Sequence, residues 1–155
     1  YNSAENFLKK ALEISPSMQR AKRELVTALL AQHRYPEALS LAKENYERDS
    51  DNTYHMHAYF RCLVKKVNIN REDIATLKEL LDKMENSYSD KKEELHMAMN
   101  IEFQANIKRK SPDEMLDLIR NAEKNFPSSV NIQRAAHEYK LKQAIVSKEV
   151  VFPED

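Results

Sequence analysis

The sequence contains no glycine, and this absence excludes two common classes of structure. Tight hairpin turns and the loops that cradle nucleotide phosphates both depend on the positive φ angles and close backbone approach that glycine allows. We therefore expect neither a β-sheet nor a phosphate-binding loop.

Cysteine is also scarce, because Cys62 is the only one in the chain. A single thiol excludes an internal disulfide and is compatible with a reducing compartment, so we expect a cytoplasmic protein. Apolar runs stay well short of the roughly 20 residues that a membrane span requires. Residues 1–30 hold no signal-like apolar block. We predict that no membrane is a partner.

An excess of charge of one sign is missing as well, since 25 basic residues balance 25 acidic ones. A neutral chain has no overall attraction for nucleic acid or for anionic lipid. The short basic run of residues 108–110 is typical of a helix end, where cations interact favourably with the helix dipole. We therefore do not expect binding to nucleic acid.

The residues that are abundant favour helices, and apolar ones recur at spacings of three and four. The breaks in this pattern predict an all-α fold with about eight helices. The predicted helices cover about residues 3–14, 17–31, 36–48, 53–64, 71–86, 91–108, 112–125 and 129–146, and residues 147–155 form an extended tail.

Three of these helices have clear start signals. Asn52 and Asn70 are in N-cap positions, and Asp73 follows Asn70 at the spacing of a capping box. Ser111 is followed by a proline in the first turn and by Glu114, which gives the strongest start in the chain. These signals fix the expected starts of the fourth, fifth and seventh helices.

Four positions of the first helix recur further along the chain at offsets of zero, four, seven and twelve. The first set is Ala4, Leu8, Ala11 and Pro16; the second, 34 residues later, is Ala38, Ala42, Asn45 and Ser50; the third is Met115, Ile119, Ala122 and Pro127. The interval before the third set exceeds two such periods by nine residues. We assign this surplus to two loops, Lys66–Asn70 and Asn86–Lys92.

This pattern resembles the tetratricopeptide repeat family, whose helix pairs recur at about 34 residues with small residues at the crossing of the second helix. The resemblance implies an α-solenoid of antiparallel helix pairs, a right-handed superhelix over residues 1–146. The chain begins at the second helix of a repeat, so we expect a truncated first repeat and a longer parent protein. The alternative is a helical bundle without a repeat.

Candidate catalytic and metal-binding residues do not form a convincing set. His55 and His57 are two apart on one helix and point in different directions, whereas a zinc site needs three or four convergent ligands. Cys62 lies among apolar residues, as a small buried side chain does. We predict no enzyme activity, no metal and no cofactor.

The resemblance implies that certain positions of each first helix face a concave groove. These positions hold Arg20, Arg23, Thr27, Tyr54, His57, Arg61, Asn100, Gln104, Lys108 and Arg134. The set is more basic than the whole chain, so we predict a groove that binds a protein or an extended acidic peptide. The alternative is that these residues form a solvated face.

The sequence therefore predicts a protein–protein interaction scaffold or sensor module within a larger protein. One alternative is an RNA-binding helical-repeat protein, although we find no repeated pair of base-reading residues. Another is a structural spacer or a self-association module, in which an open end with Phe7, Leu8 and Leu12 packs against a second copy.

Overall fold

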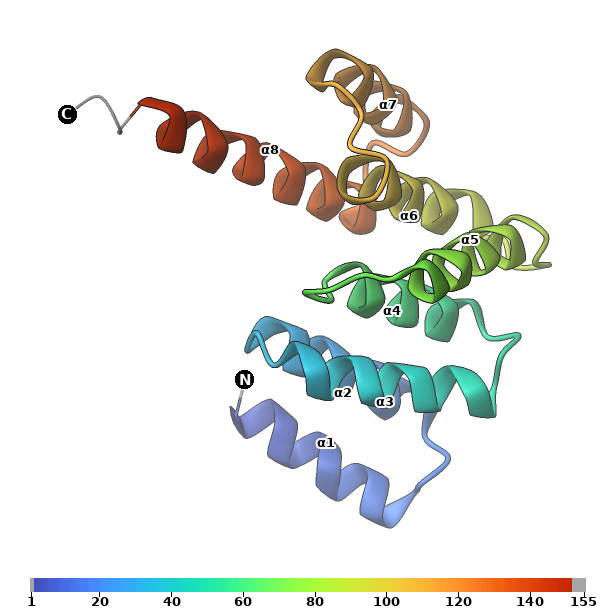
Figure 1. Cartoon of the computed structure of the whole chain (residues 1–155). Coiled ribbons are helices and arrows are strands. Elements are labelled where there is room, and N and C mark those ends of the chain that lie inside the picture. Colours follow the sequence, from blue (N-terminus) through green and yellow to red (C-terminus); the bar gives the residue numbers. More distant parts are fainter. Residues whose placement is uncertain (1, 152–155) are drawn as a thin grey trace. The chain divides into compact units, whose positions relative to one another are not determined.

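The computed structural model describes residues 2–151, with side chains for residues 3–145, and within these limits it has eight helices and no strand (Figure 1). The helices are α1 (Asn2–Ile14), α2 (Gln19–Ala31), α3 (Tyr35–Arg48), α4 (Thr53–Val64), α5 (Arg71–Glu85), α6 (Lys92–Asn106), α7 (Pro112–Asn125) and α8 (Val130–Val151). The predicted all-α fold is confirmed, and each helix overlaps the range that the apolar pattern indicated.

The three predicted caps form as hydrogen bonds. The Asn52 side chain accepts from the Tyr54 backbone N–H at 2.9 Å. Asn70 and Asp73 make a complete capping box at the start of α5. The Ser111 hydroxyl accepts from the Glu114 backbone N–H at 3.3 Å. These bonds pair backbone donors that have no partner inside the helix, so they hold the starts of α4, α5 and α7 in place.

The turn after α2 shows how a chain without glycine ends a helix. His33 takes a left-handed conformation with φ of 58°, a place where glycine is usual. The His33 N–H donates to the carbonyl of Leu30 and the Arg34 N–H to that of Leu29, both at 3.0 Å. This is the Schellman pattern, formed although the Cβ of His33 disfavours it by roughly 1 kcal/mol or more.

The C-terminal helix is longer than the sequence pattern indicated. α8 continues to Val151, so residues 147–151, which were expected in an extended tail, are helical. No proline or glycine occurs between Ser147 and Val151 to break the helix there. Residues 152–155 lie outside the described part of the chain.

The chain divides into two compact units, residues 1–89 and 90–155. The division falls inside the loop Asn86–Lys92, one of the two that we assigned as surplus to the repeat. In the first unit each helix from α1 to α5 packs against the next, and α2 also contacts α4. In the second unit α6, α7 and α8 contact one another. The predicted superhelix over residues 1–146 remains a prediction.

In the first unit, small residues allow α3 to approach its neighbours closely. Ala38 and Ala42 are completely buried, and α3 contacts both α2 and α4. Ala4, which holds the equivalent position in α1, is exposed, because no described helix covers that face. The repeat pattern therefore marks a helix crossing in α3, whereas in α1 its first position, Ala4, is exposed and its second, Leu8, is buried.

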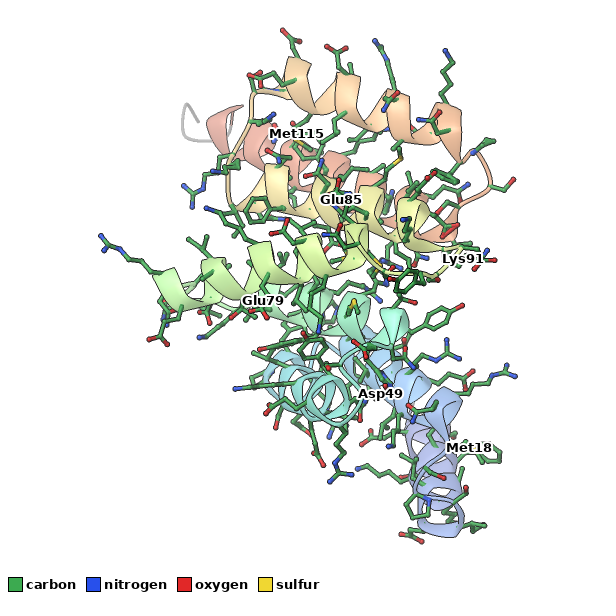
Figure 2. All side chains as sticks on the ribbon, turned by 90° about the vertical axis from the view of Figure 1, so that its right-hand side faces the viewer. Met18, Asp49, Glu79, Glu85, Lys91 and Met115 are labelled. Atoms are coloured by element: carbon green, nitrogen blue, oxygen red, sulfur yellow. The ribbon has the colours of Figure 1, made fainter. Side chains whose placement is uncertain are left out.

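In the second unit, the three helices enclose one apolar core. Met115 of α7 lies inside it and is completely buried (Figure 2). The core residues are Ala98, Ile101, Met115, Ile119, Ala122, Ile132, Ala135 and Ala136. The third copy of the repeat pattern thus supplies the residues with which α7 packs on α6 and α8.

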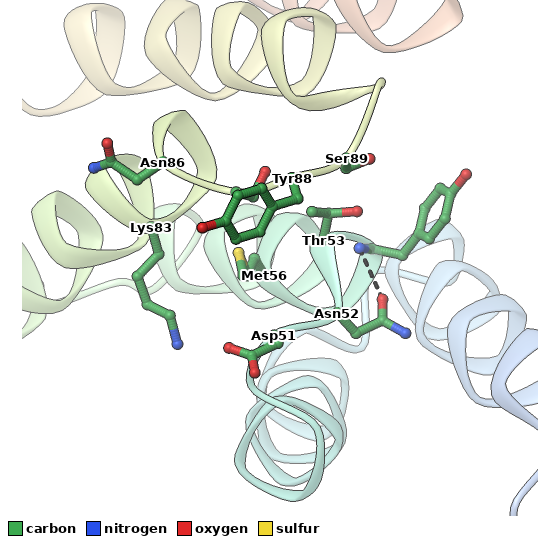
Figure 3. A pocket seen from close by; sticks show the side chains of 10 residues that line it. Asp51, Asn52, Thr53, Met56, Lys83, Asn86, Tyr88 and Ser89 are labelled. Carbon is green, nitrogen blue, oxygen red and sulfur yellow. Dashed lines mark hydrogen bonds between the residues drawn. The ribbon is translucent and has the colours of Figure 1, made fainter.

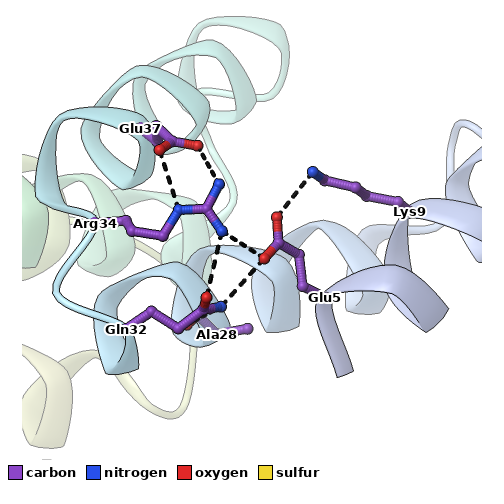
Figure 4. A network of polar contacts seen from close by, with 6 residues as sticks. All are labelled: Glu5, Lys9, Ala28, Gln32, Arg34 and Glu37. Carbon is purple, nitrogen blue, oxygen red and sulfur yellow. Dashed lines mark hydrogen bonds and ion pairs between the residues drawn. The ribbon is translucent and has the colours of Figure 1, made fainter. Parts of the chain in front are cut away.

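A network of charged side chains joins α1 to the turn between α2 and α3 (Figure 4). Glu5 is only 6% exposed and bonds Lys9 at 2.8 Å, Gln32 at 3.2 Å and Arg34. Arg34 also bonds Glu37. The hydrogen bond from Lys9, together with those from Gln32 and Arg34, outweighs burial and lowers the pKa of Glu5 to about 2.

The depressed pKa of Glu5 predicts an acid-sensitive contact between α1 and α2. Glu5→Gln should lower the urea midpoint at neutral pH, because the ionised carboxylate stabilises the fold above its ordinary pKa of 4.5. The difference in urea midpoint between this variant and the wild type should shrink as the pH falls from about 4.5 to about 2. Urea titrations across this pH range measure the difference, and Glu13→Gln, at an exposed position of the same helix, is the control. An equal loss at every pH would contradict the assignment.

Candidate peptide-binding surface

The predicted groove residues of α2 share one face of the helix. Arg20, Arg23 and Thr27 are separated by three and four residues, which places them in line on a helix. The Arg20 Nε donates to Glu24 at 2.9 Å, and the Thr27 hydroxyl donates to the carbonyl of Arg23 at 3.2 Å. Arg20 and Thr27 are exposed, so this face is open to solvent.

The predicted groove residues of α4 form a second line at the same spacing. Tyr54 is 43% exposed, whereas His57 is buried and Arg61 is half-buried. The Nε of Arg61 is buried and has no hydrogen-bond partner among the described residues. A buried N–H without an acceptor is unfavourable by roughly 1–3 kcal/mol, so this atom is a position where an acceptor would be stabilised.

A single contact shows that these two lines adjoin. The guanidinium carbon of Arg23 lies 4.1 Å from the centroid of the Tyr54 ring, a cation–π stack between α2 and α4. The direct packing of α2 against α4 holds the two helices in this register. Arg23 and Tyr54 therefore lie side by side, whereas a groove lined by all six predicted residues stays a prediction, since His57 is buried. We call the predicted set of Arg20, Arg23, Thr27, Tyr54, His57 and Arg61 the α2/α4 surface.

The four predicted residues of the second unit lie on α6, on the turn after it, and on α8. The Gln104 amide donates to Asn100 at 3.0 Å, and Arg134 donates to Asn131 at 3.1 Å. Lys108 is exposed just beyond the end of α6. α6 and α8 contact each other, so these residues belong to one helix pair. A groove that runs through both units stays a prediction.

A hollow of about 630 Å³ next to Tyr54 was not predicted. Its lining comes from the start of α4, the turn before it, the end of α5 and the loop after that helix (Figure 3). The lining residues are Asp51, Asn52, Thr53, Tyr54, Met56, Lys83, Asn86, Ser87, Tyr88 and Ser89. The sequence analysis gave Asn52 as an N-cap and Asn86 as the start of a surplus loop, and the contact of α4 with α5 brings these two segments together.

Lys83 fixes one wall of this hollow. Its ammonium donates to the Tyr46 hydroxyl at 2.9 Å and to the carbonyl of Ser50 at 3.0 Å, which ties α5 to α3 and to the turn after it. The lining carries donors and acceptors together, including the carboxylate of Asp51 and the amide of Asn86. Such a mixture can pair with both the N–H and the C=O groups of a peptide backbone.

A buried histidine lies behind the α2/α4 surface. The Nε2 of His55 lies 2.5 Å from the Gln19 side-chain oxygen, which makes this nitrogen the donor, and His55 is only 1% exposed. Its other ring nitrogen, Nδ1, is buried without a described partner. Burial, aided by Lys22 and Arg23 and opposed by Asp49, lowers the pKa of His55.

Within the described residues, no group of three or more His, Cys, Asp or Glu side chains is arranged to hold a metal ion. Among the described helices, none has the length and hydropathy that a membrane crossing requires. Cys62 is buried and belongs to no disulfide among the described residues.

Comparison with known families identifies the first part of the chain. Residues 1–66 match the family model for the tetratricopeptide repeat. This N-terminal part belongs to the tetratricopeptide repeat family. The matched stretch holds α1 to α4, and therefore the whole α2/α4 surface and the first two copies of the repeat pattern. Residues 67–155 lie outside the match, and there the repeat assignment depends on the third copy of the sequence pattern and on helix packing.

Two further comparisons gave no match, either among curated proteins or among solved structures. Tetratricopeptide repeats are in general protein–protein interaction modules and are typically non-catalytic. In the matched stretch, two of the residues that we predicted to face the groove, Arg23 and Tyr54, stack on each other.

The lowered pKa of His55 predicts that mild acid weakens the packing of α2 on α4. In the unfolded chain, His55 takes up a proton below its ordinary pKa of 6.5, whereas in the folded chain its lowered pKa keeps the ring neutral to lower pH. The free energy of unfolding should therefore fall as the pH is lowered from about 7 to about 5. One such group contributes at most about 1.4 kcal/mol per pH unit.

His55→Leu should remove this contribution and flatten the pH dependence of unfolding measured in urea. The exposed His137→Gln is the matched control and should keep the wild-type slope. If His55→Leu and wild type show the same slope, the buried histidine does not resist protonation.

Proposed function

We propose that the α2/α4 surface binds an extended acidic segment of a partner protein, and that the chain acts as an interaction scaffold or sensor module. The observation that carries this proposal is the stack of Arg23 on Tyr54, with Arg61 on the same line of α4 as Tyr54. The general role of tetratricopeptide repeats in protein–protein interaction supports it. We place the module in the cytoplasm and assign it no catalytic role.

The two arginines give the surface its preference for carboxylates. A guanidinium is planar and presents its N–H groups in a fork that matches a carboxylate in two-point contact. The stack on Tyr54 holds the Arg23 guanidinium in place, so little side-chain freedom is lost when the ligand binds. The buried Nε of Arg61 would gain the acceptor that the described residues do not provide.

The hollow beside Tyr54 extends the same surface. A peptide whose carboxylate lies between Arg23 and Arg61 can continue toward the start of α4, where Asn52, Thr53 and Ser87 offer neutral donors and acceptors. Such groups pair with backbone amides without selecting particular side chains. We propose that the arginines select acidic residues, and that the hollow holds the chain on either side of them.

In the second unit, we propose that Asn100, Gln104, Lys108 and Arg134 make a further contact with a partner protein. The set contains two amide side chains and two cations. The amides already bond one another, which orients them before a ligand arrives. Their chemistry suits a polar peptide with acidic residues, as in the first unit.

Charge reversal at the two arginines tests the α2/α4 surface. Arg23→Glu combined with Arg61→Glu should weaken binding of a fluorescent Glu-Ser peptide by at least about tenfold, since each charged hydrogen bond contributes roughly 1.5–3 kcal/mol. Fluorescence anisotropy measures the affinity, and circular dichroism checks the helix content. A Gln-Ser peptide of equal length should bind weakly to both proteins.

The control for net charge is Arg71→Glu with Lys78→Glu, because both residues are exposed on α5, away from this surface. This variant should bind the Glu-Ser peptide like the wild type. Equal losses in both double variants would mean that only overall charge matters. Displacement of the peptide by single-stranded RNA, but not by an acidic protein segment, would favour the RNA-binding alternative.

Self-association through α1 is a second candidate function, favoured by a specific observation. Phe7 and Ile14 are 72% and 86% exposed, and with Ala4 and Ala11 they lie at three- and four-residue spacing along one face. The positions of α3 that correspond to Ala4 and Ala11, Ala38 and Asn45, are buried, and α3 contacts helices on both sides. An apolar stripe of this kind is the usual mark of a helix–helix contact.

If copies associate through α1, light scattering should show a mass that rises with protein concentration. Phe7→Ser with Ile14→Ser should then give a monomer at every concentration, with unchanged helix content. Val67→Ser, at an equally exposed apolar residue in a loop, is the control and should leave association intact. A wild-type protein that stays monomeric throughout would exclude this function for the chain as given.

A further inference from the structure

A second cavity lies on the other side of α4, where α3, the end of α4 and the following loop meet. Its volume is about 560 Å³, within the range of small-molecule sites in proteins. Pro36, Leu39, Cys62 and Val67 supply apolar lining, and the ring of Tyr35 adds an aromatic wall. None of these residues belongs to the α2/α4 surface. Val67 comes from the loop Lys66–Asn70, one of the two surplus loops.

Three ammonium groups surround this apolar lining, and among the described lining residues none is acidic. Lys66 bonds the carboxylate of Asp73 at 2.8 Å, which compensates its charge. The Nζ of Lys65 lies 5.9 Å from the centroid of the Tyr35 ring, at the edge of the cavity. With Lys66 compensated and Lys65 beside the Tyr35 ring, Lys43 is the ammonium group at which we place an anionic ligand group.

The hydrogen-bonding groups of the lining are unbalanced, which limits the class of ligand. The three ammonium groups of the lining are strong hydrogen-bond donors. The neutral side chains that can accept a hydrogen bond are those of Ser40 and Asn68. The Tyr35 hydroxyl can also accept, but it already contacts His33. A peptide backbone brings a donor with every residue and would leave several unpaired. A carboxylate brings acceptors only.

We propose that this cavity binds a small amphiphilic carboxylate, with an apolar body against Pro36, Leu39 and Cys62 and an anionic head at Lys43. The site is independent of the acidic-peptide surface. The apolar lining stabilises the body by burial, and the ammonium of Lys43 stabilises the head as a charge-assisted hydrogen-bond donor. The surplus loop borders one side of the cavity with Val67 and Asn68, both of which are exposed.

Straight-chain carboxylates are the probes for this site. Hexanoate, octanoate and decanoate should bind with one-to-one stoichiometry in calorimetry, and each added methylene should tighten binding by about three- to fourfold. Octanol has a similar apolar body without the charge and should bind about tenfold more weakly than octanoate. Amide chemical shifts should change at Leu39, Lys43 and Val67, and not at Phe7 or Ile14 of the α1 stripe.

Two substitutions separate the apolar body from the charged head. Ser40→Leu places a larger side chain at an exposed, helix-compatible position of the lining, and should abolish binding of both octanoate and octanol. Lys43→Gln should weaken octanoate by about tenfold and leave octanol unchanged. Lys78→Gln, on the exposed face of α5, is the matched control and should bind both like the wild type.

Three results would each overturn the proposal. The first is unchanged octanoate binding in Ser40→Leu. The second is a shift map centred on Phe7 and Ile14, which would place the probe on the α1 stripe. The third is an affinity for octanol equal to that for octanoate, which would mean that the cavity does not recognise the carboxylate. Peptide binding by the α2/α4 surface is measured separately, so its failure would not be confused with these results.

Discussion

The close packing of α3 between α2 and α4 is the constraint on which the first unit depends. Ala38 and Ala42 have no exposed surface, and a larger side chain at either position would separate the helices. Because α3 holds its neighbours at this distance, α2 and α4 also contact each other directly. That contact places Arg23 of one helix over Tyr54 of the other, so the proposed binding surface follows from two alanines on a different helix.

Because the chain has no glycine, the left-handed position after α2 is occupied by a residue with a side chain. His33 accepts a left-handed conformation that glycine would adopt without strain, and its ring nitrogen contacts the Tyr35 hydroxyl at 2.6 Å. The same turn carries Arg34, whose bonds to Glu5 and Glu37 connect α1 with α3. The turn is thus held by ion pairs as well as by backbone hydrogen bonds, which offsets part of the conformational strain.

Local pattern was sufficient to predict the helices, the caps and the line of residues on each helix face. The resemblance to the repeat family selected Arg20, Arg23 and Thr27, whose spacing puts them on one helix face, and capping chemistry predicted the contact of Asn70 with Asp73. What could not be predicted depends on residues distant in sequence. Glu5 meets Arg34 across 29 positions, and Lys83 meets Tyr46 across 37.

The two cavities escaped prediction for the same reason. Each forms where a helix end meets a loop from another part of the first unit, and loops have no periodicity from which to predict such a meeting. The surplus of nine residues against the repeat was the one available signal. It identified the loop Lys66–Asn70, which lines the apolar cavity, and the loop Asn86–Lys92, which contributes to the polar hollow.

The chain has no net charge, so both proposed sites must act through local charge. At physiological ionic strength, exposed charges interact over only about 8 Å, and long-range steering of a ligand is weak. Recognition then depends on how each cation is held. Arg23 is oriented by an aromatic ring and suits the planar contact of a side-chain carboxylate, whereas Lys43 is a point charge beside an apolar cavity. The guanidinium of Arg23 and the ammonium of Lys43 therefore favour two different anionic ligands, an acidic peptide and a small amphiphilic carboxylate, at two sites of the first unit.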